Sequence, residues 1–488
     1  MSSSRLFAAC LFLSPALALA QASASSPASN PLAPYIAVSN PVVALTHIEV
    51  IDGTGAVPVA DQTIVIDGGK IVSVTPSASA QIPAGARVLD LAGHTVYPGL
   101  IGMHEHLFYV EPGTKELTGL AASEAQQTAP RLYLAAGITT ARTTGSIEPY
   151  TDLNLKQAID AGLAPGPDLD VTGPYLDGPG TFVNMARQLT SVADAKSTVD
   201  YWAQEGVTSF KAYMWIVPDQ LKAAIDAAHA HGIKITGHLC SVGFTEAAAM
   251  GIDDLEHGLL VDTEFSPGKK PGACPADLNV PREVGTELDL NSAPVKAMIR
   301  TLVDHHVAIT STLSVFESLL PNRPPAAFLN REKETLMPEA WASILERRSL
   351  IGENAAKSYW PAALKKEMEF ERAFVAAGGL LMAGCDPTAY GAVLAGFGDQ
   401  RNLELLVEAG FTPEQAIQIY TQNAANYLDR EDRIGTIAAW KQADLVVVQG
   451  DAAKDISAVN HVQLVFKKGV GYDPGKLIES TRGMVGIR

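Results

Sequence analysis

The chain has 488 residues, of which 47% are hydrophobic and 18% are charged, and its formal net charge is −17. This composition excludes an intrinsically disordered protein, because so many apolar residues can bury a large core. The negative charge argues against nucleic acid or an anionic membrane surface as a partner, since both would repel the chain.

The first forty residues have the features of an export signal. Arg5 precedes an apolar run over 6–19, and Ala18-Leu19-Ala20 has the small-X-small form of a cleavage site. We therefore expect residues 1–20 to be a signal peptide and the mature protein to be periplasmic or secreted. The run is shorter than the ~20 apolar residues of a membrane span, so no membrane anchor is expected. Residues 21–40, rich in Ser, Ala and Pro, are predicted to form a flexible leader.

Both ends of the remaining chain contain short β-strand patterns. Near the N-terminus, Thr63–Ile66 and Lys70–Val74 flank Asp67-Gly68-Gly69, which is typical of a β-hairpin. Near the C-terminus, Leu445–Val448 and Val462–Phe466 are also strand-like. We predict that residues 41–95 and 429–488 together form one small β-sandwich.

Residues 96–428 alternate strand and helix patterns, which is typical of βα units around a parallel sheet. The predicted strands are Tyr97–Met103, Ile138–Ala141, Leu169–Thr172, Thr208–Ala212, Lys234–Thr236, Asp254–Glu256, Val307–Thr310 and Leu380–Ala383. Gln220–His231 is a predicted helix, ending before Gly232. Eight such units predict an α/β fold of the (β/α)8 TIM-barrel type, with its active site at the carboxyl ends of the strands.

Two connections and three cysteines complete this outline. Residues 261–294 and 314–340 are long and Pro-rich, and we interpret them as lids or specificity loops. The mature chain keeps Cys240, Cys274 and Cys385, an odd number that implies no full disulfide framework. Cys240 and Cys385 are expected to be small buried packing residues.

Residues able to bind a metal follow several of the predicted strands. His104 and His106 stand two apart at a strand end, so their side chains share one face and can reach a single ion. Four further candidates lie just past strands 4, 5, 6 and 8: Lys211, His238, His257 and Asp386. In a barrel these positions converge on one cavity, and imidazoles with a carboxylate suit zinc or a similar divalent ion.

With these residues the chain resembles the amidohydrolase superfamily over nearly its whole mature length. The matching features are Pro98-Gly99-Leu100-Ile101 before the two histidines, the single histidines His238 and His257, and the late Asp386. The stretches Phe210-Lys211-Ala212-Tyr213 and Thr139-Thr140-Ala141-Arg142 are most similar to the secreted prolidase-like and dipeptidase branch.

The resemblance implies a metal-dependent hydrolase that cleaves an amide bond of the peptide or N-acyl amino acid type. It implies two Zn²⁺ ions, held by the following residues: His104, His106 and Asp386 for the first, His238 and His257 for the second, and carboxylated Lys211 as the bridge. A neutral buried lysine can add CO₂ to become a carbamate, whereas an ammonium has no lone pair for a metal. Water between the ions would attack as hydroxide.

Three residues receive catalytic roles in this scheme. Asp386 would take the proton of the attacking water and pass it to the leaving amine. Tyr213 shares the strand face of Lys211 and is a candidate to contact the substrate carbonyl. Arg142 is predicted to bind a substrate carboxylate bidentately, and a structural ion pair is its alternative. The expected partner is a small molecule or short peptide, and the resemblance implies a homo-oligomer.

Two alternatives remain open from the sequence. One is a mononuclear hydrolase of a cyclic amide or lactone, or a deaminase. Deaminases of the superfamily place a glutamate three residues after the strand-5 histidine, where this chain has Ser241, and this argues against deamination. The other is an inactive barrel-fold binding protein, against which the complete set of ligands speaks.

Overall fold

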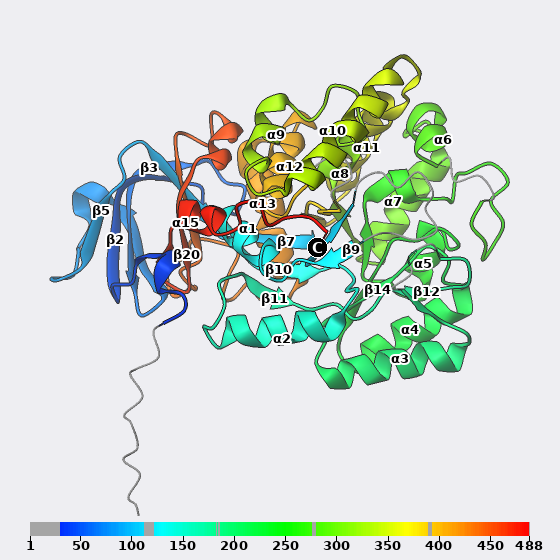
Figure 1. The fold of residues 1–488 in the computed structure, drawn as a ribbon, viewed down its shortest axis with the longest axis horizontal. Coiled ribbons are helices and arrows are strands. Elements are labelled where there is room, and N and C mark those ends of the chain that lie inside the picture. The colour runs from blue at the N-terminus through cyan, green and yellow to red at the C-terminus, as the bar shows by residue number, and fades with distance from the viewer. Residues whose placement is uncertain are drawn as a thin grey trace, which may run out of the picture.

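The computed structural model describes residues 30–111, 122–181, 183, 186–275, 280–388 and 393–487. The predicted signal peptide and the first part of the predicted leader lie outside these residues. The described chain is a mixed α/β fold in which a sheet built from the two chain ends adjoins a unit of strands and helices (Figure 1). Within the described residues, no helix is both long and apolar enough to cross a bilayer.

Strands from both ends of the chain form one nine-stranded sheet. The strands are β1 (Ile36–Val38), β2 (Val42–Val50), β3 (Val59–Asp67), β4 (Lys70–Pro76), β5 (Arg87–Asp90), β6 (His94–Pro98), β19 (Leu445–Gln449), β20 (Val462–Lys467) and β21 (Val470–Tyr472). β6 pairs antiparallel with β19, so that Tyr97 lies opposite Val446. Buried side chains such as Leu45, Ile64 and Phe466 give this sheet an apolar core of its own.

The hairpin predicted near the N-terminus is confirmed. β3 and β4 pair antiparallel, and Asp67 lies opposite Lys70. Gly68 and Gly69 have φ angles of 55° and 82°, the left-handed conformation that a two-residue turn of this kind requires. The prediction of a flexible leader is wrong at its end, because β1 pairs with β21 and Ile36 lies opposite Tyr472.

All eight strands predicted for the central region are present, seven of them with shifted bounds. They are β7 (Leu100–Glu105), β10 (Ile138–Thr143), β11 (Asp168–Asp170), β14 (Ser209–Ala212), β15 (Lys234–Gly237), β16 (Asp254–Glu256), β17 (Ala308–Ser311) and β18 (Leu381–Ala383). β11, β10 and β7 form one parallel sheet, and a seven-stranded parallel sheet runs from β13 (Arg187–Gln188) and β12 (Leu176–Asp177) through β14 to β18. β8 (Phe108–Val110) and β9 (Ala122–Glu124) form a separate antiparallel pair.

In the described residues, the eight strands do not form one continuous closed sheet. On one side the two sheets meet at a bridge between Thr172 and Ser209, beyond the short β11. Just beyond this junction, Pro174 has no N–H to donate and forms only an isolated bridge with Ser146. On the other side, the Asp386 N–H donates to the His104 carbonyl oxygen at 3.0 Å, which joins the chain after β18 to β7.

The strand predicted over Tyr97–Met103 divides at Gly99. The residues before Gly99 belong to the terminal sheet, and those after it form β7. A Cβ atom at Gly99 would lie 2.1 Å from Thr139 Oγ1, so a residue with a side chain would clash with β10 at this crossing. Glycine therefore allows the chain to pass from one sheet to the other in close contact with β10.

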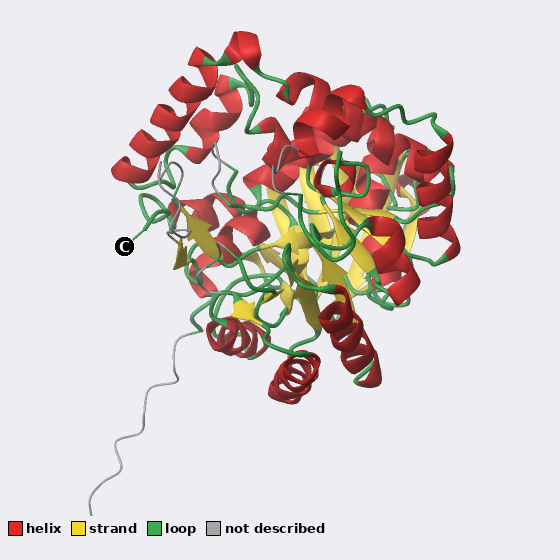
Figure 2. Ribbon diagram, turned by 90° about the vertical axis from the view of Figure 1, so that its right-hand side faces the viewer, coloured by secondary structure: helices red, strands yellow, loops and turns green. Residues whose placement is uncertain are grey.

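Helices surround the central strands (Figure 2). The α-helices are α1 (Ala129–Ala135), α2 (Pro149–Asp160), α3 (Val192–Glu205), α4 (Pro218–Ala230), α5 (Phe244–Met250), α6 (Val280–Glu287), α7 (Ala293–Asp304), α8 (Leu313–Glu317), α9 (Ala326–Glu332), α10 (Pro338–Glu353), α11 (Trp360–Ala376), α12 (Phe397–Glu408), α13 (Pro413–Tyr420), α14 (Gln422–Tyr427) and α15 (Pro474–Glu479). α4 confirms the predicted helix: it begins with Pro218, and Gly232 beyond its end has φ 68°. The 3-10 turn η3 (Gly258–Val261) directly follows His257.

Each of the two long connections contains helix. In the described residues the first contains α6, and the second contains most of α8, all of α9 and the start of α10. Val261 from the first and Val315 and Phe316 from the second line the central cavity. Both connections therefore form part of its wall.

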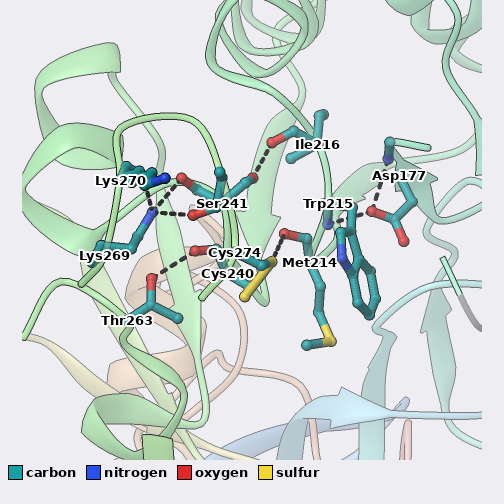
Figure 3. The surroundings of a disulfide bond; sticks show 12 residues. Asp177, Met214, Trp215, Ile216, Cys240, Ser241, Thr263, Lys269, Lys270 and Cys274 are labelled. Atoms are coloured by element: carbon teal, nitrogen blue, oxygen red, sulfur yellow. Dashed lines mark hydrogen bonds between the residues drawn. A yellow bond between two sulfur atoms is a disulfide. The ribbon is translucent and has the colours of Figure 1, made fainter. Parts of the chain in front are cut away.

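The prediction that Cys240 is a simple packing residue is wrong. Cys240 forms a disulfide with Cys274, 34 residues away, whereas Cys385 is a free buried thiol as predicted (Figure 3). Sequence spacing did not indicate the pair, because the chain between the two cysteines folds back on itself. Thr263 Oγ1 donates to the Cys240 carbonyl oxygen at 2.6 Å, and Lys269 Nζ donates to that of Ser241 at 2.6 Å. The disulfide thus fastens the first long connection to the segment that follows β15.

Candidate metal centre

The six predicted ligands converge on one cavity at the carboxyl ends of the central strands. His104 lies on β7, Lys211 lies on β14, and the others follow β7, β15, β16 and β18. The cavity has a volume of about 500 Å³ and is lined by all six: His104, His106, Lys211, His238, His257 and Asp386. Its position agrees with the general location of active sites in folds of this type.

His104, His106 and Asp386 form the tightest group. Asp386 Oδ1 lies 3.2 Å from His106 Nε2 and 3.7 Å from His104 Nε2, and one ligand atom from each residue lies within 4.8 Å of the others. Although burial by itself raises the pKa of Asp386, His104, His106 and Lys211 hold the pKa well below its usual range. An ionised carboxylate with two imidazoles is a donor set that fits a divalent metal ion such as zinc.

A buried carboxylate orients the first imidazole of this group. His104 Nδ1 lies 2.6 Å from Glu256 Oε2, and both side chains are fully buried. Burial and the Lys211 charge keep the pKa of His104 well below its ordinary value, so the ring is neutral and its single proton is on Nδ1, toward Glu256. The Nε2 lone pair then faces the cavity, which is the arrangement that second-shell carboxylates give to metal-binding histidines.

His238, His257 and Lys211 lie beside this group. The His257 ring centroid is 4.5 Å from the centroids of both His104 and His238. Burial lowers the pKa of His238 to about 3, so its imidazole is neutral at physiological pH. Burial also lowers the pKa of Lys211 to about 8, and Lys211 Nζ lies 3.3 Å from His104 Nε2. A sizeable fraction of this lysine is therefore an uncharged amine near pH 8.

The backbone at two of the ligands has an uncommon conformation. His257 has φ 70° and Asp386 has φ 49°, both in the left-handed region that non-glycine residues rarely adopt. At His257 the conformation is held from outside, because Glu367 on α11 accepts the N–H groups of Leu259 and Leu260 at 3.1 and 2.8 Å. Backbone strain of this kind is concentrated at functional sites.

Arg142 does not line the cavity, and the prediction that it binds a substrate carboxylate is wrong. Its side chain is buried beneath the ligands, with Nη2 2.7 Å from Asp254 Oδ2 and 2.9 Å from Glu256 Oε1. The alternative, a structural ion pair, is the one that the structure contains. The physical reason is that the guanidinium is buried away from the cavity, where Asp254 and Glu256 on β16 accept from its Nη2.

Tyr213 lines the cavity as predicted, and its ring packs edge-on against His238 with centroids 5.0 Å apart. Sequence reasoning missed Asp254, Glu256, Glu367 and Arg347, the last of which also lines the cavity. Asp254 and Glu256 could have been found from the sequence, because charged residues two apart in a buried strand point to the same side and need a partner. Nothing in the sequence pointed to Glu367, because its contacts depend on how α11 packs against η3.

Comparison with known proteins places this architecture in one family. The model of the amidohydrolase family matches residues 95–470. The chain belongs to the amidohydrolase family.

Solved structures of similar fold include hydrolases of several kinds. A prolidase candidate from Bifidobacterium longum superimposes with a TM-score of 0.65 at 24% identity, covering 90% of this amidohydrolase and 98% of the other chain. A Xaa-Pro dipeptidase with methionine bound in its active site has a TM-score of 0.64 at 20% identity, covering 88% and 100%. Ochratoxinase from A. niger has a TM-score of 0.61 at 17% identity, covering 91% and 99%.

Among curated proteins, an imidazolonepropionase from Streptomyces griseus is 31% identical over 117 residues, which are 24% of this chain. The match spans 28% of the length of that relative. Family membership, together with peptidase and hydrolase neighbours, supports a hydrolytic enzyme that acts on C–N bonds.

Proposed function

We propose that this amidohydrolase cleaves an amide bond of the peptide or N-acyl amino acid type with the help of two Zn²⁺ ions. The observation that carries the proposal is the convergence of four neutral imidazoles, one ionised carboxylate and one lysine of lowered pKa on a single buried cavity. His104, His106 and Asp386 would hold one ion, His238 and His257 the other. Lys211, carboxylated, would bridge them, since its amine is unusually able to add CO₂.

When bound, such ions polarise the scissile carbonyl and lower the pKa of a water molecule. The protein groups then have defined tasks. Asp386 is ionised and can accept the proton of the attacking water on a carboxylate oxygen, and it can return this proton to the leaving amine nitrogen. Tyr213, whose ring packs against His238, would orient the substrate carbonyl. Neutral His238 and His257 supply lone pairs and no competing charge.

A mononuclear hydrolase of a cyclic amide is the second candidate, favoured by the local match to imidazolonepropionase. Deamination is less well supported. Ser241 stands where a deaminase would carry its glutamate, and its Oγ is buried and donates to the Ile216 carbonyl oxygen. No acid is therefore available at that position.

Metal content separates these functions. We expect about two zinc equivalents in the wild type, with loss of at least one in Lys211→Ala, and hydrolysis of a panel of dipeptides and N-acyl amino acids that is lost with the metal. Lys222→Ala, which removes an exposed lysine from α4, is the matched control. One zinc equivalent that survives Lys211→Ala would favour the mononuclear candidate.

We also propose export, a closed barrel and a β-sandwich. The Cys240–Cys274 disulfide supports an oxidising compartment such as the periplasm or the exterior, in agreement with the signal-peptide pattern of residues 1–20. The Asp386–His104 backbone bond and the Thr172–Ser209 bridge are the contacts through which residues 96–428 would close as a (β/α)8 barrel. The separate apolar core of the terminal sheet supports a flanking sandwich unit. Assembly into a homo-oligomer remains a prediction from the family resemblance.

A further inference from the structure

Beyond the six ligands, the wall of the cavity is mainly apolar and aromatic. Phe316 lies next to one of the candidate ligands: its ring centroid is 6.1 Å from that of His257. Trp360 stacks on Phe316 with centroids 6.2 Å apart, and Tyr359 lies 5.2 Å from Trp360. An aromatic wall, formed by Phe316, Trp360 and Tyr359, therefore leads from the candidate metal centre outward.

One permanently charged group faces this apolar cavity. Arg347 lies on α10 three residues after Ile344 and seven after Ala340, so the three side chains share one face of the helix. Ala340 and Ile344 are buried, whereas Leu345 on the other face is 47% exposed. Arg347 therefore extends from the buried face of α10, and its side chain lines the cavity.

The Arg347 guanidinium is not held by a close partner. In the described part of the chain it forms no ion pair within 4.0 Å, and its Nε is buried without a hydrogen-bond partner. Its neighbour Arg348 differs, since it donates to the carbonyl oxygens of Ser318 and Leu320 at 2.8 and 3.1 Å. A buried N–H without a partner is costly, so this half-buried guanidinium beside an apolar wall is suited to receive an anion from a ligand.

We propose that Arg347 binds the free carboxylate of the substrate, and that the substrate is an N-acyl amino acid or dipeptide with a bulky apolar or aromatic side chain at its carboxyl end. This inference rests on the proposed amide hydrolysis and names its substrate class. The planar guanidinium fork matches a carboxylate bidentately, and the aromatic wall matches the side chain next to that carboxylate. The amide bond between them and the acyl group would then lie toward the ligands.

Two compounds that differ only in the carboxylate test the inference: N-acetyl-L-phenylalanine and N-acetyl-2-phenylethylamine. For the wild type we expect kcat/KM to favour the carboxylate compound by about 10- to 100-fold, the range of one charged hydrogen-bonded contact. Arg347→Met should abolish this preference, mainly through KM, and Arg347→Lys should keep part of it. Arg348→Met, which removes a charge from the same helical turn, should retain the preference.

The outcomes separate the inference from the function on which it rests. If both compounds are hydrolysed equally by the wild type, or Arg347→Met keeps the preference, the role of Arg347 is overturned while amide hydrolysis stands. If no amide is hydrolysed, the proposed function fails, and calorimetry with L-phenylalanine still decides the role of Arg347. Binding that is at least tenfold weaker in Arg347→Met than in Arg348→Met would support a carboxylate site, and equal binding would overturn it.

Discussion

Arg142 provides the sharpest test of how the site is held together. Its guanidinium is 1% exposed and contacts two carboxylates, Asp254 and Glu256, that are fully buried. Replacing it with Met removes the cation and leaves both carboxylates unpaired in the interior. Breaking a buried pair from one side costs about 3–5 kcal/mol, so we expect the free energy of unfolding to fall by about that amount.

The same change should disturb the metal centre indirectly. Without Arg142, protonation is the way for Asp254 to lose its charge, and the pKa of Asp254 is already raised to about 7 by burial and by Glu256. Glu256 would also lose the guanidinium that donates to its Oε1, and a carboxylate held less firmly would orient the His104 imidazole less well. We therefore expect zinc affinity to fall together with stability, and hydrolysis of all substrates to fall alike.

Equilibrium urea unfolding of the metal-free protein, with refolding as the check on reversibility, measures the first effect, and zinc titration measures the second. Arg482→Met, which removes an exposed arginine paired with Glu479, is the matched control and should leave the unfolding midpoint unchanged. The reasoning would be refuted if Arg142→Met unfolded like the wild type and lost activity only toward substrates that carry a carboxylate. That result would restore Arg142 as a substrate-binding residue.

Three further changes test other contacts. Glu256→Gln keeps an acceptor for His104 but not its charge, and should lower zinc affinity by about 10- to 100-fold in a competition assay with a chelator. Cys274→Ser opens a loop of 34 residues and should lower the free energy of unfolding by up to about 4 kcal/mol under non-reducing conditions, whereas Cys385→Ser, which breaks no disulfide, should lower it less. Lys211→Met should stabilise the metal-free protein at pH 7 by about 3 kcal/mol, because the folded state lowers the lysine pKa from 10.5 to about 8 and disfavours its charge. This gain in the free energy of unfolding is full below pH 8 and declines as pH rises from about 8 to 10.5. If the gain stayed constant across that range, the pKa of Lys211 would not be lowered in the folded protein.

The parts of the fold that sequence predicted are those set by local pattern. The eight central strands, the Asp67-Gly68-Gly69 hairpin and α4 each depend on residue periodicity or on glycine and proline at a turn or helix end. What the sequence did not predict depends on distant packing. β1 forms where it pairs with β21, and Cys240 meets Cys274 because the first long connection folds back over the end of β15.

The candidate site divides in the same way. The convergence of the six candidate ligands was predictable because each lies at or just past the carboxyl end of a strand, and parallel strands bring their carboxyl ends together. The groups that hold them were not, because Glu367 reaches the turn after His257 from α11, a helix more than a hundred residues further along the chain. Sequence indicates which side chains can bind a metal, whereas the packing of helices decides which of them are held in the required conformation.

The two arginines show why a substrate-binding residue is harder to predict than a ligand. Arg142 belongs to a stretch that carries the family resemblance, and it was therefore expected to bind a substrate carboxylate. Inside the fold, however, its charge is matched by Asp254 and Glu256. Arg347 lies on α10, a helix that begins at the end of the second long connection and has no motif around it, and it forms no close ion pair in the described residues. A cation is available to a ligand when the fold does not neutralise it, and that property depends on every element that surrounds it. For this amidohydrolase, substrate preference is thus expected to depend on α10 more than on the strands that position the candidate metal ligands.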